Sequence, residues 1–250
     1  MRFAVCIKQV PDVAAPVQIR DGALVFDTGR LVLNAYDASA VEAALVLTET
    51  HGGEIDLVCV GPEKARETIR KALAMGAHRA THLVTDDAAV LDSGATAALL
   101  ARHFEAHGGY DAILCGKQSQ DTDAGLTGAM LAAHLGLPYA TNAVGLEQEG
   151  DTLVVTRQGD AGQEIIALPA PCLVTCSNDM NDPRIPNIKG IMQSKRKPME
   201  TEPAEVPGAR TRVVAYEPMP EREAGPQFEG EPDELARTLA DRLTNEAKVL

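Results

Sequence analysis

The segment at residues 116–128 carries the side chains best suited to chemistry, because it mixes three glycines with hydroxyl and carboxylate groups. It follows an apolar run at 112–115 and leads into an apolar stretch with helical spacing. Glycines let the backbone approach a ligand closely, and free amides at the start of a helix attract phosphate. The segment is not a Walker A loop, since no Gly-Lys-Ser/Thr closes it. It therefore predicts a nucleotide site, although a strand–loop–helix connection with a capping Asp or Thr explains it equally well.

Groups that could perform catalysis are few. Asp121 and Asp123 could act as acid and base or hold a cation, but in a glycine-containing loop such residues more often turn or cap the backbone. No Ser or Cys lies in a nucleophile-elbow context, and the six histidines are scattered along the chain. We therefore predict no catalytic residue and no metal site, and expect a protein that binds rather than catalyses.

Three further loops are expected to lie beside this segment. Each follows a predicted strand or precedes a predicted helix, and the carboxyl ends of parallel strands meet at one edge of a sheet, where open α/β sheets bind ligands. These loops lie at residues 7–12, 33–37 and 60–62. Together with residues 116–127 they predict a crevice for a nucleotide, although Asn34 and Asp37 taken singly are explained by turn and cap roles.

The elements that position these loops alternate along the first 135 residues. Strands are expected at 3–7, 55–60, 82–85 and 111–115, and helices at 37–49, 63–75, 93–107 and 127–135. This order predicts right-handed crossovers and an α/β fold with a parallel sheet. Small antiparallel hairpins are expected at 17–30, turning at Asp21-Gly22, and at 152–167, followed by a buried strand at 173–176.

Composition agrees with a helix-covered parallel sheet. Of 250 residues 45% are apolar, yet only 3% are aromatic and Trp is absent, so Ala, Val, Leu and Ile must fill the core. The net charge of −13 argues against non-specific nucleic-acid binding. Five cysteines without a CxxC pair fit a reducing compartment, and no apolar run reaches membrane-spanning length. We expect a cytoplasmic protein (mitochondrial matrix if eukaryotic), without membrane insertion or a nucleic-acid partner.

The C-terminal part has a different texture. Residues 181–197 contain two prolines that predict an extended loop, with apolar residues beside a basic tract that could dock an acidic partner or form an ordinary solvated loop. From about Pro198 the chain is rich in Pro and Glu, and an amphipathic helix is expected at 231–250. We expect residues 1–200 to form the nucleotide-binding α/β domain. Residues 201–250 would form an extended arm and helix that docks on another subunit or caps its own domain.

In this order the segments resemble the β subunits of electron transfer flavoproteins, the family that includes the FixA proteins. The matching pieces are IKQVPD at 7–12, residues 34–45, ALAMGA within 68–80, residues 116–128, Arg157 with 168–170, and NDPR with the Lys-rich tract in 181–198. The resemblance implies an adenine nucleotide α-hydrolase-like, Rossmann-like domain and a larger α subunit that holds most of the FAD. It also implies an electron carrier without catalytic activity, serving flavoprotein dehydrogenases and a quinone reductase or other acceptor.

The resemblance further implies two sets of binding residues. A structural AMP is expected to contact Cys6, Asn34, Ala35, Tyr36, Asp37, Val60, Gly116, Lys117, Gln118, Ser119, Gln120, Asp121, Thr122, Asp123, Ala124, Gly125, Leu126 and Thr127. Partner dehydrogenases are expected to bind a loop at 176–190, through Met180, Asn181, Pro183, Arg184, Ile185 and Ile188. Met180 would insert into a pocket of the dehydrogenase.

Other functions remain possible on sequence alone. Asn34-Ala35-Tyr36-Asp37 is closer to a minority branch that carries a second FAD in this site and bifurcates electrons. Gly116-Lys117-Gln118 and Thr127-Gly128 are closer to the AMP branch, which we favour. An enzyme using ATP at the same loop is an alternative from a different class, and a nucleotide sensor is disfavoured by the long arm.

Overall fold

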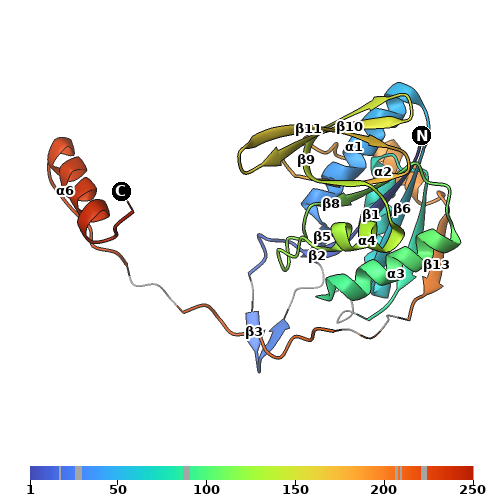
Figure 1. The fold of residues 1–250 in the computed structure, drawn as a ribbon. Coiled ribbons are helices and arrows are strands. Elements are labelled where there is room, and N and C mark those ends of the chain that lie inside the picture. The colour runs from blue at the N-terminus through green and yellow to red at the C-terminus, as the bar shows by residue number, and fades with distance from the viewer. Residues whose placement is uncertain are drawn as a thin grey trace. The chain divides into compact units, whose positions relative to one another are not determined.

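The computed structural model is organised by a nine-stranded sheet (Figure 1). Its strands are β1 (Arg2–Ile7), β6 (Glu54–Gly61), β7 (Arg79–Val84), β8 (Ala112–Gly116), β9 (Tyr139–Glu149), β10 (Thr152–Gly159), β11 (Gly162–Pro169), β12 (Cys172–Cys176) and β13 (Met199–Pro203). The order is β11-β10-β9-β12-β8-β1-β6-β7-β13. Neighbouring strands in the part of the sheet ordered β9-β12-β8-β1-β6-β7-β13 pair in parallel. β10 pairs antiparallel with both β9 and β11. The structure describes residues 1–16, 18–25, 30–86, 91–205, 208, 210–220 and 224–249.

Helices cover both faces of the parallel part. They are α1 (Ala35–His51), α2 (Arg66–Met75, after a 3-10 turn at Glu63–Ala65), α3 (Ser93–Ala106), α4 (Thr127–Leu135) and α5 (Ile188–Ser194). One core cluster joins α1 and α2 to alternate residues of β1, such as Phe3 and Val5, and the other joins α3 and α4 to Ala4. Because side chains alternate across a strand, this division places the two helix pairs on opposite faces of the sheet. The strands therefore read as continuous apolar runs, as in β6, of which all but the first residue are buried.

The predicted α/β fold with a parallel sheet is confirmed. The strands predicted in the first 135 residues are present, and α4 has the predicted bounds. The antiparallel hairpins are also found, as β10 with β11 and as β3 (Gln18–Arg20) with β4 (Ala23–Val25) around Asp21-Gly22. Val17 and residues 26–29, the rest of the second predicted hairpin, lie outside the described residues.

Several elements were not predicted. β9 is long but carries Asn142 at a positive φ of 58° and shifts register against both neighbours, so its alternation is broken. β2 (Gln9–Pro11) pairs with β5 (Leu31–Leu33) in a ribbon too short to give a pattern. The extended loop predicted for 181–197 is wrong from residue 188 onward, because Asn187 caps α5 by accepting a bond from the Gly190 amide at 2.8 Å.

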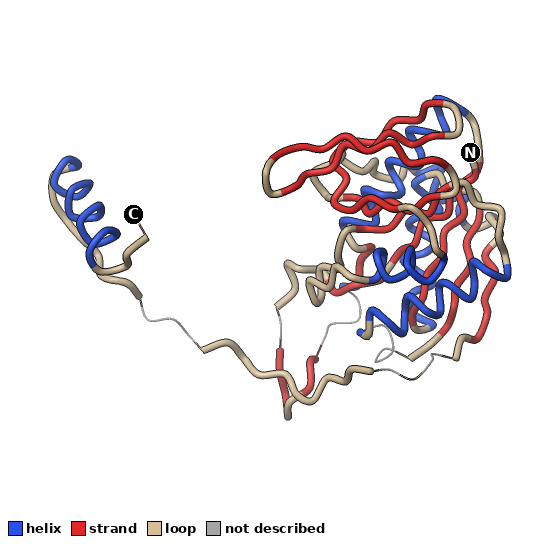
Figure 2. Tube along the Cα trace, viewed as in Figure 1, coloured by secondary structure: helices blue, strands red, loops and turns tan. Residues whose placement is uncertain are grey.

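The chain forms two units, Met1–Tyr216 and Glu217–Leu250. β13 crosses the predicted boundary at residue 200 and belongs to the first unit. The second unit contains α6 (Pro232–Asn245), whose described residues are all at least partly exposed. Figure 2 shows how the strands gather in the first unit. Within the part of the chain that the structure describes, no helix has the length and apolar character needed to cross a membrane.

Candidate functional site

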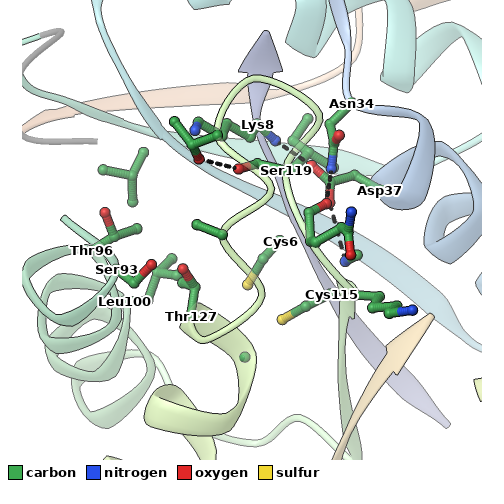
Figure 3. A pocket seen from close by; sticks show the side chains of 18 of the residues that line it. Cys6, Lys8, Asn34, Asp37, Ser93, Thr96, Leu100, Cys115, Ser119 and Thr127 are labelled. Carbon is green, nitrogen blue, oxygen red and sulfur yellow. Dashed lines mark hydrogen bonds between the residues drawn. The ribbon is translucent and has the colours of Figure 1, made fainter. Parts of the chain in front are cut away.

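A pocket lies at the carboxyl ends of β1 and β8, where the strand order reverses (Figure 3). From β1 the chain proceeds through β6 and β7 on one side, then crosses to β8 on the other side of β1. Such a reversal opens a crevice, and it is where open α/β sheets bind ligands. The space inside the pocket amounts to about 700 Å³ when its mouth, which is open to solvent, is included.

Asp37, in the first turn of α1, ties the two central strands together. Its Oδ2 accepts a bond from the Lys8 amide at 2.7 Å and its Oδ1 accepts one from the Gly116 amide at 3.1 Å. A side chain at Gly116 would place its Cβ 2.2 Å from Asp37 Oδ1, so only glycine fits there. Burial raises the pKa of Asp37 to about 7, against the opposing effects of its hydrogen bonds with Asn34, Lys8 and Gly116.

Asn34 and Gln120 brace the loop at 116–127 against the start of α1. Asn34 Nδ2 donates to the Gln118 carbonyl at 2.8 Å, and Asn34 Oδ1 accepts from the Gln120 amide at 3.1 Å. The Gln120 side chain in turn accepts from the Ala35 amide at 3.1 Å. These side-chain groups shape the loop, and Asn34 also faces the pocket.

The two carboxylates of the loop both have side-chain partners, one outside the loop and one within it. Asp121 forms an ion pair with Lys8, with Nζ–O distances of 2.8 and 2.9 Å. Asp123 accepts a bond from Gln118 Nε2 at 3.0 Å and has a positive φ of 51°. Neither arrangement is that of an acid–base pair, and both agree with the turn role that such residues commonly have.

Hydroxyl and amide groups gather at the end of the pocket formed by the loop and α4. The hydroxyls of Ser119 and Thr122 lie 2.9 Å apart, and Thr127 also lines the pocket. No described side chain caps α4. Its first amides therefore add donors near these hydroxyls, as in sites that hold phosphate.

The start of α3 supplies pocket residues that the sequence did not reveal. Ser93 and Thr96 line the pocket opposite the loop, and the buried Thr96 Oγ1 has no hydrogen-bond partner among the described residues. Asp92 precedes them and accepts from the Ala95 amide at 2.8 Å. Its other oxygen accepts from the amide and hydroxyl of Thr211 at 2.9 and 2.8 Å. These bonds, the Ala95 amide first, lower the pKa of Asp92 to about 2. The sequence order offers one signal for this placement: α3 follows β7, so its start was expected near the carboxyl edge of the sheet, where the pocket lies.

The structure brings many of the predicted nucleotide-binding residues together. Those that line the pocket are Cys6, Asn34, Asp37, Val60, Gly116, Lys117, Gln118, Ser119, Thr122, Ala124 and Thr127. The others, which are not part of the lining, are Ala35, Tyr36, Gln120, Asp121, Asp123, Gly125 and Leu126. Cys115, which was not predicted, lies beside Cys6 (Figure 3). A hydrogen bond with Cys115 and desolvation raise the pKa of Cys6 well above its usual range, so Cys6 is a thiol rather than a nucleophilic thiolate at neutral pH.

The loop predicted for partner recognition is held firmly on α1. Arg184 forms a two-pronged ion pair with the buried Glu42 at 2.9 Å and a second pair with Glu49. Ion pairing with Glu49 and Glu42 raises the pKa of Arg184. Asn181 donates to the Ser39 carbonyl at 3.1 Å. The half-buried Met180 packs against the core, whereas 91% of Ile185 is exposed.

α5 continues this exposed apolar surface. Ile188, Ile191 and Met192 are exposed, with Ile188 at 79%. The basic tract that follows α5 ends at Lys197, which was expected to add to a docking surface for an acidic partner but points inward instead. Its Nζ donates to the carbonyls of Leu73 and Ala77, at 2.9 and 2.7 Å, at the end of α2. Lys197 is therefore a helix-end contact and not part of a docking charge.

Comparison with known proteins identifies the family. Residues 23–207 match the model of the electron transfer flavoprotein domain. A chain from Syntrophomonas wolfei named electron transfer flavoprotein subunit beta is 33% identical over 250 residues, covering 100% of this chain and 98% of the relative. One of the same name from Bacillus subtilis is 34% identical, with both chains fully covered. The caffeyl-CoA reductase-Etf complex subunit CarD of Acetobacterium woodii is 37% identical over 80% of this chain and 77% of its own length. This chain belongs to the electron transfer flavoprotein family, as a β subunit and an electron carrier rather than a catalyst.

Proposed function

We propose that the pocket at the ends of β1 and β8 holds AMP as a structural ligand. We further propose that the chain pairs with a larger α subunit carrying FAD. The observation that carries the proposal is the buried hydroxyl of Thr96, which has no hydrogen-bond partner in the part of the chain that the structure describes. It faces the loop at 116–127 across a crevice at the reversal of strand order. A buried polar atom without a partner is costly, and a nucleotide hydroxyl or phosphate oxygen would supply the missing bond.

The lining suits the two ends of a nucleotide. Val58, Val60 and Leu100 make one wall apolar, as an adenine ring requires. The hydroxyls of Ser119 and Thr127 and the first amides of α4 would hold the phosphate. Neither Asp121 nor Asp123 is free to move a proton, which disfavours the alternative of an ATP-using enzyme. FAD held by the α subunit would accept and release the electrons.

The loop at 176–190 and α5 would contact the partner dehydrogenase. Ile185 and Ile188 are exposed apolar side chains, and the backbone beneath them is fixed by Arg184 and by the cap at Asn187. A rigid loop loses little entropy on binding, so these side chains suit a docking site. The proposed partners are flavoprotein dehydrogenases as donors and a quinone reductase or similar acceptor.

A second FAD in place of AMP is the alternative. It is favoured by the residues at 34–37, which resemble the branch of the family with a second FAD. AMP is favoured over a second FAD because Gly116-Lys117-Gln118 and Thr127-Gly128 resemble the AMP branch of the family. Gly128 is pressed against β12, where a Cβ would lie 2.5 Å from Thr175 Cγ2. That contact fixes the first amides of α4 close to the pocket, where a phosphate fits.

The test is the nucleotide content of the complex co-expressed with its α subunit, released by denaturation and separated by chromatography. One AMP and one FAD per heterodimer is the expected result. Two FAD and no AMP would establish the alternative. Heterodimers without any nucleotide on this chain would refute the assignment of the pocket.

A further inference from the structure

A second cluster of ligand-type side chains lies away from the pocket. His103 and His107 occupy the last turn of α3 and the residue after it, four positions apart, and Glu202 comes from β13. One potential ligand atom from each residue lies within 4.8 Å of the other two. The prediction of no metal site gave no weight to this spacing, and nothing in the sequence shows that a strand 95 residues further on would supply the carboxylate.

The ring nitrogens are arranged as a metal requires. His107 Nδ1 lies 3.1 Å from the His103 carbonyl, which can only accept, so Nδ1 carries the proton and Nε2 has a free lone pair. A bond from the second ring nitrogen to a carbonyl is the usual support for a metal-bound histidine. The buried His103 has both ring nitrogens without a hydrogen-bond partner among the described residues.

The surrounding charges also favour a cation. His103 is only 6% exposed, and a metal bond would give its buried ring the partner that it lacks among the described residues. Glu200 and Glu202 point to the same face of β13 because they are two residues apart. Since Glu202 belongs to the cluster, this face of β13 brings two carboxylates toward the histidines. A divalent ion would be attracted by the same charge.

We propose that His103, His107 and Glu202 form a site for a borderline divalent metal of the Zn²⁺ class, which fastens α3 to the edge strand β13. Two imidazoles and one carboxylate are ligands that Zn²⁺ accepts, with water in the fourth position. Bonds of about 2.0–2.1 Å in a tetrahedron place ligand atoms about 3.4 Å apart, so the cluster must contract by roughly 1 Å or somewhat more. Rotation of the exposed His107 and the half-buried Glu202 can supply this movement.

The site lies where β13 leaves the sheet. β13 pairs in parallel with β7, placing Glu202 beside Leu83, and just beyond it Arg102 Nη2 donates to the Glu205 carbonyl at 2.6 Å. The metal would therefore strengthen an attachment that hydrogen bonds already make. This role is structural and independent of the nucleotide pocket.

The test is titration of the metal-free, full-length chain with Zn²⁺ by calorimetry, and with Co²⁺ followed by visible absorption. We expect one Zn²⁺ per chain, the absorption of four-coordinate Co²⁺, and a rise in Tm with Zn²⁺. His107→Gln and Glu202→Gln should each weaken binding by at least about 10–100-fold and abolish the rise in Tm. His51→Gln, at the exposed end of α1, is the matched control and should bind like the unaltered chain. Affinity should fall as the solution is made more acidic, because protons compete with the metal for its ligands.

Two results would overturn the proposal. One is binding by the unaltered chain no tighter than that of His107→Gln and Glu202→Gln. The other is stoichiometric binding that both variants retain, which would place the metal elsewhere. Neither result bears on the nucleotide content of the pocket.

Discussion

Burial and hydrogen bonding have opposite effects on the pKa of Asp37. Its carboxyl group joins the ends of β1 and β8 while it is only 6% exposed. Because its pKa is raised on folding, the native state holds a proton between about pH 4 and pH 7 that the unfolded chain has released. The contribution of Asp37 to stability is therefore greatest below about pH 4 and is lost as pH rises to about 7.

Asp37→Asn should flatten the pH dependence of the free energy of unfolding across this range. Each unit by which folding displaces a pKa is worth about 1.4 kcal/mol, so the difference in slope is measurable by urea unfolding at several pH values. Asp21→Asn, in the exposed turn between β3 and β4, is the matched control. Parallel stability curves for Asp37→Asn and the unaltered chain would contradict the raised pKa.

Thr96 offers a test of the pocket at the level of one atom. Thr96→Val removes a hydroxyl that has no partner among the described residues, so the Tm of the nucleotide-free protein should not fall. The affinity for AMP should drop by about 2- to 13-fold, the equivalent of one hydrogen bond of about 0.5–1.5 kcal/mol. Thr96→Ser keeps the hydroxyl and should bind AMP normally. A lower Tm with unchanged AMP affinity would make Thr96 a packing residue only.

At the scale of elements, the exposed apolar surface of the recognition loop and α5 is the feature to probe. Introducing charge with Ile185→Asp and Ile188→Asp should slow electron acceptance from a partner dehydrogenase about tenfold or more, since buried hot-spot contacts are worth about 2 kcal/mol. FAD content and Tm should stay unchanged because both side chains are exposed.

Ile165→Asp is the matched control for that experiment. Ile165 lies on β11 and is also largely exposed, at 76%. It should accept electrons at the normal rate. Equal slowing by all three substitutions would show a general charge effect and would argue against a docking surface at α5.

The elements themselves were predictable where apolar runs are long and uninterrupted. Strands such as β6 and β8 are buried on both faces, so each gives a run of mostly apolar residues. Such a run can be recognised in the sequence without knowing which strands lie beside it. β9 leaves no such signal, because one part of it pairs with β12 and another with β10, with a register shift between them. α5 was missed because it contains Gly190, and glycine disfavours a helix. The structure shows why glycine is present there: a Cβ at this position would lie 2.5 Å from the Ala74 carbonyl oxygen.

The pocket was predictable as a set of loops but not as a set of contacts. The glycine-containing loop follows β8 in sequence, so its place at the sheet edge could be inferred. Thr96 reaches the pocket from α3 only because the chain reverses direction along the sheet between β7 and β8. Likewise, sequence charge alone cannot show that Lys197 turns inward to the carbonyls that end α2.

At the scale of the whole molecule, we expect the unit Glu217–Leu250 to add little to the stability of the first unit. None of the described residues of α6 is buried, and Leu239 is 55% exposed. Deleting residues 217–250 should shift the Tm of the first unit by less than about 2 °C, because little apolar surface is lost from its core. The deletion should weaken association with the α subunit, as measured by analytical ultracentrifugation. An unchanged heterodimer affinity would refute the docking role of the arm.

The first turn of α3 serves two neighbours at once. Ser93 and Thr96 face the pocket, while Asp92 holds the amide and hydroxyl of Thr211, where the chain departs toward the second unit. A ligand that stabilised this turn would stabilise both the pocket wall and the contact of Asp92 with Thr211. Equilibrium coupling is reciprocal, so a nucleotide that stabilised the Asp92–Thr211 contact would itself bind more tightly when that contact is formed. We therefore expect loss of the Asp92–Thr211 contact to weaken nucleotide binding, and a bound nucleotide to hold the segment around Thr211 more firmly.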